Sequence, residues 1–501
     1  MHHLLNILIW FPILMGGLLL WMGQDSKPDQ SRWIALATVG LSLVLGGYML
    51  AGFDVSARTM QYFESFSWIP TFGISYRLGV DGLSLLLIVL SIFTNLIVIL
   101  ATWTSITQRV ASYLACFLIM QGLLVGVFAA LDAIVFYVFW EATLVPMYLI
   151  IGFWGSENRV YAAIKFFLYT FLGSVLMLVA FLYLGYMAGT FDIASLYDVK
   201  LSLWAQTLIF IAFFFGFAIK VPMFPVHTWL PDAHTEAPAG GSIVLAAILL
   251  KLGAYGFIRF ALPIVPDACS HYAMVIVVLS LIAIVYIGFI ALVQTDVKRL
   301  IAYSSISHMG FVTLGCFAVF LLRGPGHLLS AGLLLEGAIV VMISHAFISS
   351  AMFAGIGFLY ERMHTRQIQD FGGIVNSMPV FASFYMLFAM ANAGLPGTSG
   401  FVGEFMVIMG SVEANFWVGF WAALSLIIGA AYTLWMYKRV IFGKVNHPKI
   451  EKLPDLNRYE RSAYILLAVM VIGMGVYPKP FIDYIHQTVS HILVFADTSK
   501  L

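Results

Sequence analysis

Long apolar runs follow one another along almost the whole chain, and this pattern limits the possible folds more than any other feature of the sequence. A helix that crosses a lipid bilayer needs about 20 mostly apolar residues. Breaks that contain charges, proline or glycine divide the sequence into fourteen such runs. We therefore expect an all-α polytopic membrane protein with about 14 transmembrane helices. The predicted spans lie near residues 3–22, 33–53, 83–102, 111–129, 131–153, 161–187, 203–224, 241–262, 273–293, 300–322, 328–359, 379–410, 416–437 and 459–477.

The composition excludes a soluble protein of the same length. Hydrophobic residues make up 62% of the chain and charged residues only 10%, whereas about 25% of residues are charged in ordinary globular domains. The net charge of +1 provides no basic surface for a nucleic acid. No connection between the predicted spans is long enough to hold a separate catalytic domain, so we expect the chain to act inside the lipid bilayer.

The sequence contains no motif for a cofactor or a metal ion. Its cysteines, Cys116, Cys269 and Cys316, are isolated in or beside apolar runs, so no zinc site or iron–sulfur cluster is expected to have its ligands here. The motif G-x-x-x-x-G-K-[ST] does not occur, which argues against ATP hydrolysis. The motif G-x-G-x-x-G does not occur either, which argues against dinucleotide binding. The first run lacks the basic segment and the cleavage site of a signal peptide, and we expect it to remain as the first span.

Lysines and arginines predict the orientation in the membrane, because positively charged connections stay on the cytoplasmic side. Counted from the N-terminus, the odd-numbered connections contain most of these residues, and the densest group lies between residues 438 and 461. The even-numbered connections contain fewer, among them Arg259. We therefore expect both chain ends on the outer side of the membrane.

Two charged residues fall at the centres of predicted spans. Glu141 lies in the run 131–153, and Lys251 lies in the run 241–262. A charge at the bilayer centre costs at least about 2.5–3.5 kcal/mol on insertion scales, and intramembrane ionisable residues are functional hypotheses by default. We expect both residues to take part in ion movement. The alternative is a structural role, such as a salt bridge that holds two helices together.

The seventh predicted span is broken beside an ionisable residue. Lys220 is followed by Pro222 and Pro225, which should remove two backbone donors and free the carbonyls of Ala218 and Val221. Free backbone groups at membrane depth survive only when they are buried in protein or line a hydrated cavity. The break therefore predicts a polar interior next to Lys220.

A second break precedes another acidic residue. The sequence GLPG (394–397) interrupts the run 379–410, and Glu404 follows it. Two broken spans in different halves of a chain, each beside an ionisable residue, are typical of transporters built from inverted repeats.

Five further ionisable residues lie in or beside the spans and are secondary candidates for a proton path. They are His227, His234, His308, His345 and Lys165. Each histidine has a packing role as its alternative, and the Lys165 side chain could instead extend to the membrane surface. The histidines lack a convergent set of ligands at the spacing that a metal site requires.

A neighbouring glutamate and lysine can hold and release a proton. At 4 Å and an effective dielectric constant of about 20, their attraction is about 4 kcal/mol. Moving one charge through about 100 mV costs about 2.3 kcal/mol. Separating such a pair can therefore drive a proton against a membrane potential, but the chain has no visible site for a fuel.

Several stretches resemble the antiporter-like subunits of proton-pumping NADH:quinone oxidoreductase, respiratory complex I. The resemblance covers roughly residues 80–440, and an acidic residue at Glu404 is similar to the M type, whereas the L type, the N type and many Mrp antiporter subunits have lysine there. The stretches are WEATLVPMYLIIGFWG (140–155), KVPMFPVHTWLPDAHTEAP (220–238), KLGAYG (251–256), DVKRLIAYSSISHMG (296–310) and GLPGTSGFVGEF (394–405).

This resemblance implies a division of the chain around two inverted five-helix repeats that contain the two broken helices. Residues 1–110 would form the first three helices, 111–262 the first repeat and 263–443 the second repeat. Residues 444–501 would form a cytoplasmic loop and the fourteenth helix.

The resemblance also implies a role for each candidate residue. Glu141 and Lys220 would form the switching pair, Lys251 the central relay and Glu404 the terminal proton site. The remaining histidines would continue, tune or hydrate the path: His227, His234, His308 and His345.

The implied function is proton translocation driven by quinone reduction in other subunits. NADH, FMN, iron–sulfur clusters and quinone would be bound by partner subunits, and the L-type and N-type antiporter-like subunits would be neighbours in a bacterial inner membrane. Three alternatives remain open: a subunit of an Mrp-type cation/proton antiporter, a scaffold that transports nothing, and quinone chemistry within this chain.

Overall fold

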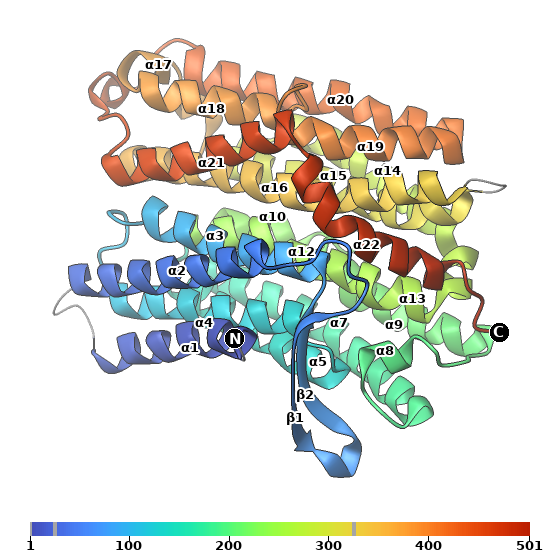
Figure 1. Ribbon diagram of the computed structural model, residues 1–501. Helices are drawn as coiled ribbons and strands as arrows, with labels where there is room; N and C mark the ends of the chain where they lie inside the picture. The colour runs from blue at the N-terminus through green and yellow to red at the C-terminus, as the bar shows by residue number, and fades with distance from the viewer. Residues whose placement is uncertain (1–2, 24–27, 323–326) are drawn as a thin grey trace.

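Helices arranged side by side make up nearly all of the protein (Figure 1). The computed structural model describes residues 3–23, 28–322 and 327–501. Within these residues, thirteen helices are long and apolar enough to cross a membrane. The remaining predicted run, 379–410, is divided between two shorter helices, α18 (Pro379–Asn392) and α19 (Ser399–Ala414). The predicted all-α membrane fold is confirmed, and the second predicted break is present.

The N-terminal region contains three spans and one element that the hydropathy pattern did not predict. The spans are α1 (Leu4–Trp21), α2 (Pro28–Ala51) and α3 (Gly82–Ala101). Between α2 and α3, the strands β1 (Gln61–Ile69) and β2 (Ile74–Val80) pair in antiparallel register around the short helix η1 (Pro70–Phe72). This hairpin projects beyond the helices in Figure 1.

The next part of the chain lies in the range for which the first repeat is predicted. Its elements are α4 (Val110–Ala129), α5 (Ala133–Ala142), α6 (Leu144–Trp154), α7 (Arg159–Ala188), α8 (Ile193–Leu196), α9 (Leu203–Lys220) and α10 (Trp229–Glu236). One further span, Ala239–Ile264, is interrupted by two π-helical turns. It consists of α11 (Ala239–Val244), η2 (Leu245–Leu249), α12 (Leu250–Gly256), η3 (Phe257–Ala261) and α13 (Leu262–Ile264).

The second half of the chain begins at Pro266. Its longer helices are α14 (Pro266–Leu292), α15 (Val297–Ala318), α16 (His327–Met363), α18 (Pro379–Asn392), α19 (Ser399–Ala414), α20 (Phe416–Tyr437), α21 (Arg458–Val476) and α22 (Lys479–Ala496). Its short elements are η4 (Val319–Leu321), η5 (Ile368–Asp370), α17 (Ile374–Ser377), η6 (Lys438–Phe442) and η7 (Pro448–Lys452).

Two spans lie in the interior of the bundle. In Ala239–Ile264 and in His327–Met363, every residue of the most apolar stretch is buried, unlike in the other spans of the described chain. The α9 helix approaches the first of them very closely. A Cβ atom on Gly253 would lie 2.4 Å from the carbonyl oxygen of Phe217, and one on Gly256 would lie 2.3 Å from its ring. Glycine is therefore required for this packing.

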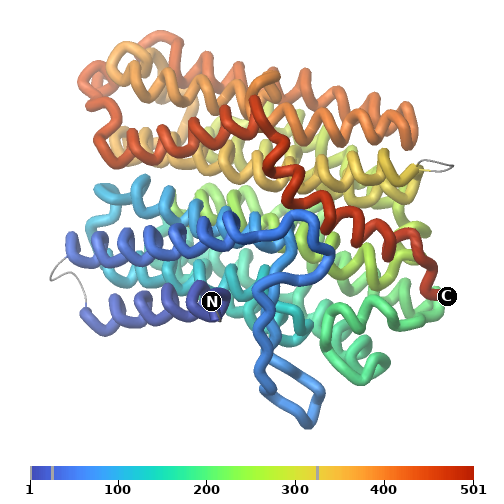
Figure 2. Tube along the Cα trace, in the orientation of Figure 1, coloured from blue at the N-terminus to red at the C-terminus, as the bar shows by residue number. Residues whose placement is uncertain are grey.

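The last helix, α22, was not predicted, because it was read as a tail after the fourteenth span. It contacts α3, α13 and α16, which are far apart in the sequence. The Tyr484 hydroxyl donates to the Leu50 carbonyl at 2.9 Å, and His486 Nδ1 lies 2.7 Å from Glu336 Oε1. In Figure 2 its red trace runs obliquely over the other helices toward the C-terminus. The helix thus ties the two halves of the bundle together.

Arg259 does not lie in an exposed connection, and that prediction was wrong. Its side chain is buried in η3, and its Nη2 lies 2.5 Å from Asp81 Oδ2 and 3.3 Å from Ser84 Oγ. Asp81 also caps α3, because it accepts a hydrogen bond from the Ser84 backbone. The carboxylate on another span allows a charge to be buried that hydropathy places at an interface.

A buried ion pair joins α16 to α21. Arg362 Nη1 and Nη2 donate to Glu460 Oε1 and Oε2 at 2.9 and 2.8 Å. Only 10% of the Arg362 side chain and 2% of the Glu460 side chain are exposed. Glu460 Oε2 also accepts the Asn457 backbone N–H at 2.8 Å, which completes a capping box at the start of α21.

We expect Glu460→Ala to destabilise the protein by about 3–5 kcal/mol, because it leaves the Arg362 guanidinium buried without its partner. The thermal midpoint of the detergent-purified protein measures the change. Glu451→Ala is the matched control, since Glu451 is exposed in η7. Equal midpoints for the two variants would contradict a stabilising role for the pair.

Candidate functional site

Glu141 and Lys220 lie near one another but do not form a direct ion pair. Glu141 is next to the end of α5, and Lys220 is the last residue of α9. Each interacts electrostatically with the other. In the described chain, neither the buried Glu141 Oε1 nor Lys220 Nζ has a hydrogen-bond partner. Lys220 Nζ instead lies 5.1 Å from the centre of the Trp140 ring. The predicted pair is therefore present in an open arrangement.

The break after Lys220 is present, and its backbone is partly rebonded. The Met223 N–H donates to the Ala218 carbonyl at 2.7 Å, so the prediction of a free Ala218 carbonyl was wrong. The Trp229 indole N–H donates to the Ile219 carbonyl at 2.8 Å. The Ala218 carbonyl is thus satisfied from within the break, and the Ile219 carbonyl from the first residue of α10.

Lys251 and His345 meet at the centre of the bundle. Lys251 Nζ lies 2.7 Å from His345 Nδ1 and donates to the Ala246 carbonyl at 2.6 Å. Both side chains are buried. Ala246 belongs to the π-helical turn η2, and such turns are frequent at functional sites. Thus the central lysine is held by an imidazole and a backbone carbonyl.

The polar row continues from His345 to Glu404. The His345 and His308 rings have their centres 5.7 Å apart. His308 Nδ1 lies 2.5 Å from Glu404 Oε1. All three side chains line a cavity of about 10 Å³, which is about the space that one water molecule needs. The predicted central lysine and terminal glutamate are therefore connected through two histidines.

A polar cluster around the second break was not predicted. Asn392, the last residue of α18, donates through Nδ2 to Ser304 Oγ at 3.1 Å and to Thr433 Oγ1 at 2.9 Å. Ser304 donates to the Tyr432 hydroxyl at 3.0 Å, and this hydroxyl is 3.5 Å from His308 Nε2. Single uncharged polar residues in an apolar run do not indicate a site in the sequence. Only the structure shows that these residues converge in one cluster.

His227 and His234 lie on either side of the residues where α10 begins. His227 belongs to the broken segment and stacks on Phe224, with ring centres 5.6 Å apart. His234 lies on α10 and stacks on Phe353 at 4.4 Å. Both are buried, and neither ring nitrogen of His234 has a hydrogen-bond partner among the residues that the structure describes.

Lys165 is bound at the edge of the site. Its Nζ lies 2.6 Å from Asp232 Oδ2 on α10, and the two side chains are 18% and 24% exposed. Arg299 Nη2 reaches the other oxygen of Asp232 at 3.5 Å. Among the three predicted lysines, Lys165 alone has a carboxylate partner within the described residues.

Metal-binding side chains do not converge in residues 3–23, 28–322 and 327–501, where no group of three His, Cys, Asp or Glu residues could hold an ion.

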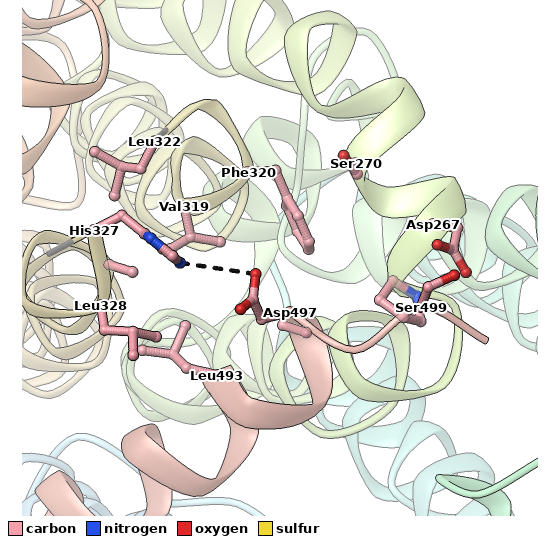
Figure 3. A pocket seen from close by; sticks show the side chains of 13 residues that line it. Asp267, Ser270, Val319, Phe320, Leu322, His327, Leu328, Leu493, Asp497 and Ser499 are labelled. Carbon is pink, nitrogen blue, oxygen red and sulfur yellow. Dashed lines mark ion pairs between the residues drawn. The ribbon is translucent and has the colours of Figure 1, made fainter. Parts of the chain in front are cut away.

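A polar pocket of about 280 Å³ lies near the C-terminus (Figure 3). His327 Nε2 lies 3.7 Å from Asp497 Oδ1 in this pocket. None of the nine predicted residues lines it.

A family model and a full-length relative both match this chain and indicate the same family. Residues 130–429 match the family model described as NADH:quinone oxidoreductase/Mrp antiporter, TM. The chain is 45% identical to NADH-quinone oxidoreductase subunit M of Rhodobacter capsulatus, over 98% of this chain and 97% of that protein.

Solved structures are similar over nearly the full length. A chain of respiratory complex I from Thermus thermophilus with bound NADH superposes with a TM-score of 0.88 at 30% identity, covering 99% of this chain and 100% of that chain. A chain of the Mrp complex from Dietzia sp. DQ12-45-1b, at 19% identity and a TM-score of 0.84, covers 98% and 99%. The latter similarity shows the fold alone.

We expect a double-mutant cycle to detect the His308–Glu404 contact. His308→Leu and Glu404→Leu should each destabilise the protein by about 1–3 kcal/mol, because each leaves a buried polar partner unpaired. The double variant should recover about 0.5–3 kcal/mol of the summed loss. Denaturing-detergent titration of the purified protein measures these values.

Glu413→Leu is the control for this cycle, since Glu413 lies on α19 but is exposed and bonded to Ser330. Its effect should add to that of His308→Leu. If Glu404→Leu were equally additive, the contact would contribute nothing to stability.

Proposed function

The chain belongs to the family of antiporter-like membrane subunits of NADH:quinone oxidoreductase, among its M-type subunits, and on this basis we propose that Glu141, Lys220, Lys251 and Glu404 move protons across the membrane. It is a membrane subunit of a proton-translocating oxidoreductase complex. The secondary residues of the proposed path are His308 and His345 in the row, with His227, His234 and Lys165 beside it.

The observation that supports this proposal most strongly is the row of contacts from Lys251 to Glu404. Its members come from α12, α16, α15 and α19, and they touch or nearly touch at bilayer depth. Hydrogen-bonded imidazoles can pass protons because each ring has two nitrogen atoms that exchange donor and acceptor roles. A purely structural lysine would be expected to have a carboxylate partner.

The open arrangement of Glu141 and Lys220 supplies the switch in this proposal. When the two groups approach to about 4 Å, their attraction of about 4 kcal/mol holds a proton on the lysine. When they separate, that stabilisation is lost, and the proton moves toward Lys251. One charge crossing about 100 mV costs about 2.3 kcal/mol, so the change in attraction is large enough to control one proton step.

The energy that opens and closes the pair comes from quinone reduction elsewhere in the complex. NADH, FMN, iron–sulfur clusters and quinone are assigned to partner subunits, and the L-type and N-type antiporter-like subunits are the proposed neighbours. We place the chain in a bacterial inner membrane with both ends on the outer side. The proposed divisions remain 1–110, 111–262, 263–443 and 444–501, with two inverted repeats in the middle.

An Mrp-type antiporter subunit is the less favoured function. The Mrp chain from Dietzia shares the fold at only 19% identity, whereas the subunit M relative is 45% identical. The acidic Glu404 also favours the M type. Purification of the tagged chain from its host, followed by an NADH:quinone reductase assay, tests the choice: activity should co-purify, and sodium-dependent proton exchange without it would overturn the assignment.

We expect Glu141→Gln and Lys220→Met to abolish most NADH-driven proton transport, because each removes one charge of the switch. Proton uptake by proteoliposomes containing the whole complex measures this. Lys479→Met is the control, because Lys479 lies outside the proposed path and its exposed ion pair with Asp483 contributes only about 0–1 kcal/mol. Normal proton-to-electron ratios in both switch variants would show that the mechanism is wrong.

We expect Glu404→Lys to impair proton transport less than Glu404→Ala does. A lysine amine keeps a titratable group beside His308, whereas alanine ends the row one residue early. The same proteoliposome assay measures both variants. Full transport by Glu404→Ala would remove Glu404 from the path.

A further inference from the structure

Besides Lys220, a further buried lysine lies outside the row, at one face of the bundle. Lys298 is the second residue of α15, only 5% of it is exposed, and its Nζ donates to the Ala237 carbonyl at 2.5 Å. Ala237 follows the last residue of α10. The connections around Thr295 and Arg366 are joined by backbone hydrogen bonds at the same face, where the Ser156 backbone N–H also donates to the Glu236 carbonyl. By the charge distribution this is the inner face.

Lys298 is not needed to neutralise the carboxylates near it. Arg366 already pairs with both, at 3.6 Å from Glu236 Oε1 and 3.3 Å from Asp296 Oδ2. In the described chain, the Lys298 ammonium donates to a backbone carbonyl and not to a carboxylate. These charged groups remain within electrostatic range of Lys298. They provide a polar entrance without holding the lysine in a fixed ion pair.

The local helices give Lys298 one structural role that must be separated from a functional one. A cation in the first turn of α15 is unfavourable, because the N-terminal end of a helix carries partial positive charge. The same cation at the C-terminal end of α10 is favourable and caps the Ala237 carbonyl. An arginine could provide this cap equally well.

His234 lies between Lys298 and the central row. It is one turn before Ala237 on α10, and it interacts electrostatically with Lys298, Lys251 and His345. Both of its ring nitrogens are buried and lack a hydrogen-bond partner within the described ranges. This imidazole has no hydrogen-bond partner on either nitrogen and interacts with two buried lysines. It is therefore suited to receive a proton on one nitrogen and release a proton from the other.

We propose that Lys298 is the inner entrance of the proton path and delivers protons to the central row through His234. In each step, an Nζ–H bond of Lys298 breaks and an N–H bond forms on one His234 ring nitrogen, and the N–H bond on the other nitrogen then breaks as that proton passes to the central row. The neutral Lys298 amine then takes a proton from water at the inner face, beside Glu236, Asp296 and Arg366. The inference rests on the proposed function and adds the place where protons enter.

Lys298→Arg distinguishes this relay from a structural cap. Arginine keeps the charge and can donate to the Ala237 carbonyl, but it does not release a proton in proteins. We expect NADH-driven proton transport by the whole complex in proteoliposomes to fall about tenfold or more in Lys298→Arg. Arg299→Met is the matched control, because Arg299 is the next residue and its side chain is 44% exposed. Normal transport by Lys298→Arg would overturn the proposal.

A second pair of variants covers the case in which arginine prevents assembly. Lys298→His keeps a titratable group and Lys298→Asn does not, so the histidine variant should transport protons faster, with a rate that depends on the pH at the inner face. Equal rates and equal pH profiles would overturn the relay.

The switch variants separate this result from failure of the proposed function. If Glu141→Gln and Lys220→Met stop transport while Lys298→Arg is normal, only the entrance assignment is wrong. If all variants transport normally, the proposed function itself is wrong.

Discussion

The contact between Lys251 and His345 is the interaction that the central helices must enclose. An ammonium group at the bilayer centre is costly unless polar atoms surround it, and here the polar atoms are an imidazole and the Ala246 carbonyl. The two spans that provide the contact are those whose apolar stretches are wholly buried. The other helices shield them from lipid, and the close approach at Gly253 shows how little space remains.

The proposed path of Glu141, Lys220, Lys251 and Glu404 has an acid–base pair at each end, and the two pairs are in different states. His308 and Glu404 are in hydrogen-bond contact, whereas Glu141 and Lys220 are near one another without direct contact. Each end lies beside a broken helix, where backbone groups can be rebonded without unfolding a complete span, as the Met223 and Trp229 hydrogen bonds show. A bundle of unbroken helices would allow neither arrangement so easily, because each freed backbone group in hydrocarbon costs several kcal/mol.

Hydropathy predicted the spans and the charged residues within them, because a charged residue inside an apolar run can be recognised from the sequence alone. It did not predict which side chains would meet. The partners of Arg259 and Lys165 are more than 60 residues away in the chain, and Asn392 and Tyr432 resemble ordinary packing residues. The hairpin was missed because its apolar runs are too short for a span, although polar and apolar residues alternate in residues 65–68. The α22 helix was missed because polar residues such as Asp483 and His486 interrupt its apolar residues and leave no run long enough for a span.

The two π-helical turns on either side of Lys251 change how this span presents its faces. A π turn adds one residue to a turn, and one residue corresponds to a rotation of about 100° in an α-helix. The residues after η3 are therefore rotated relative to those before η2, and a helical wheel drawn from Ala239 would assign them to the wrong side. The neighbouring helices that the side chains of this span face therefore change at Leu245–Leu249 and again at Phe257–Ala261.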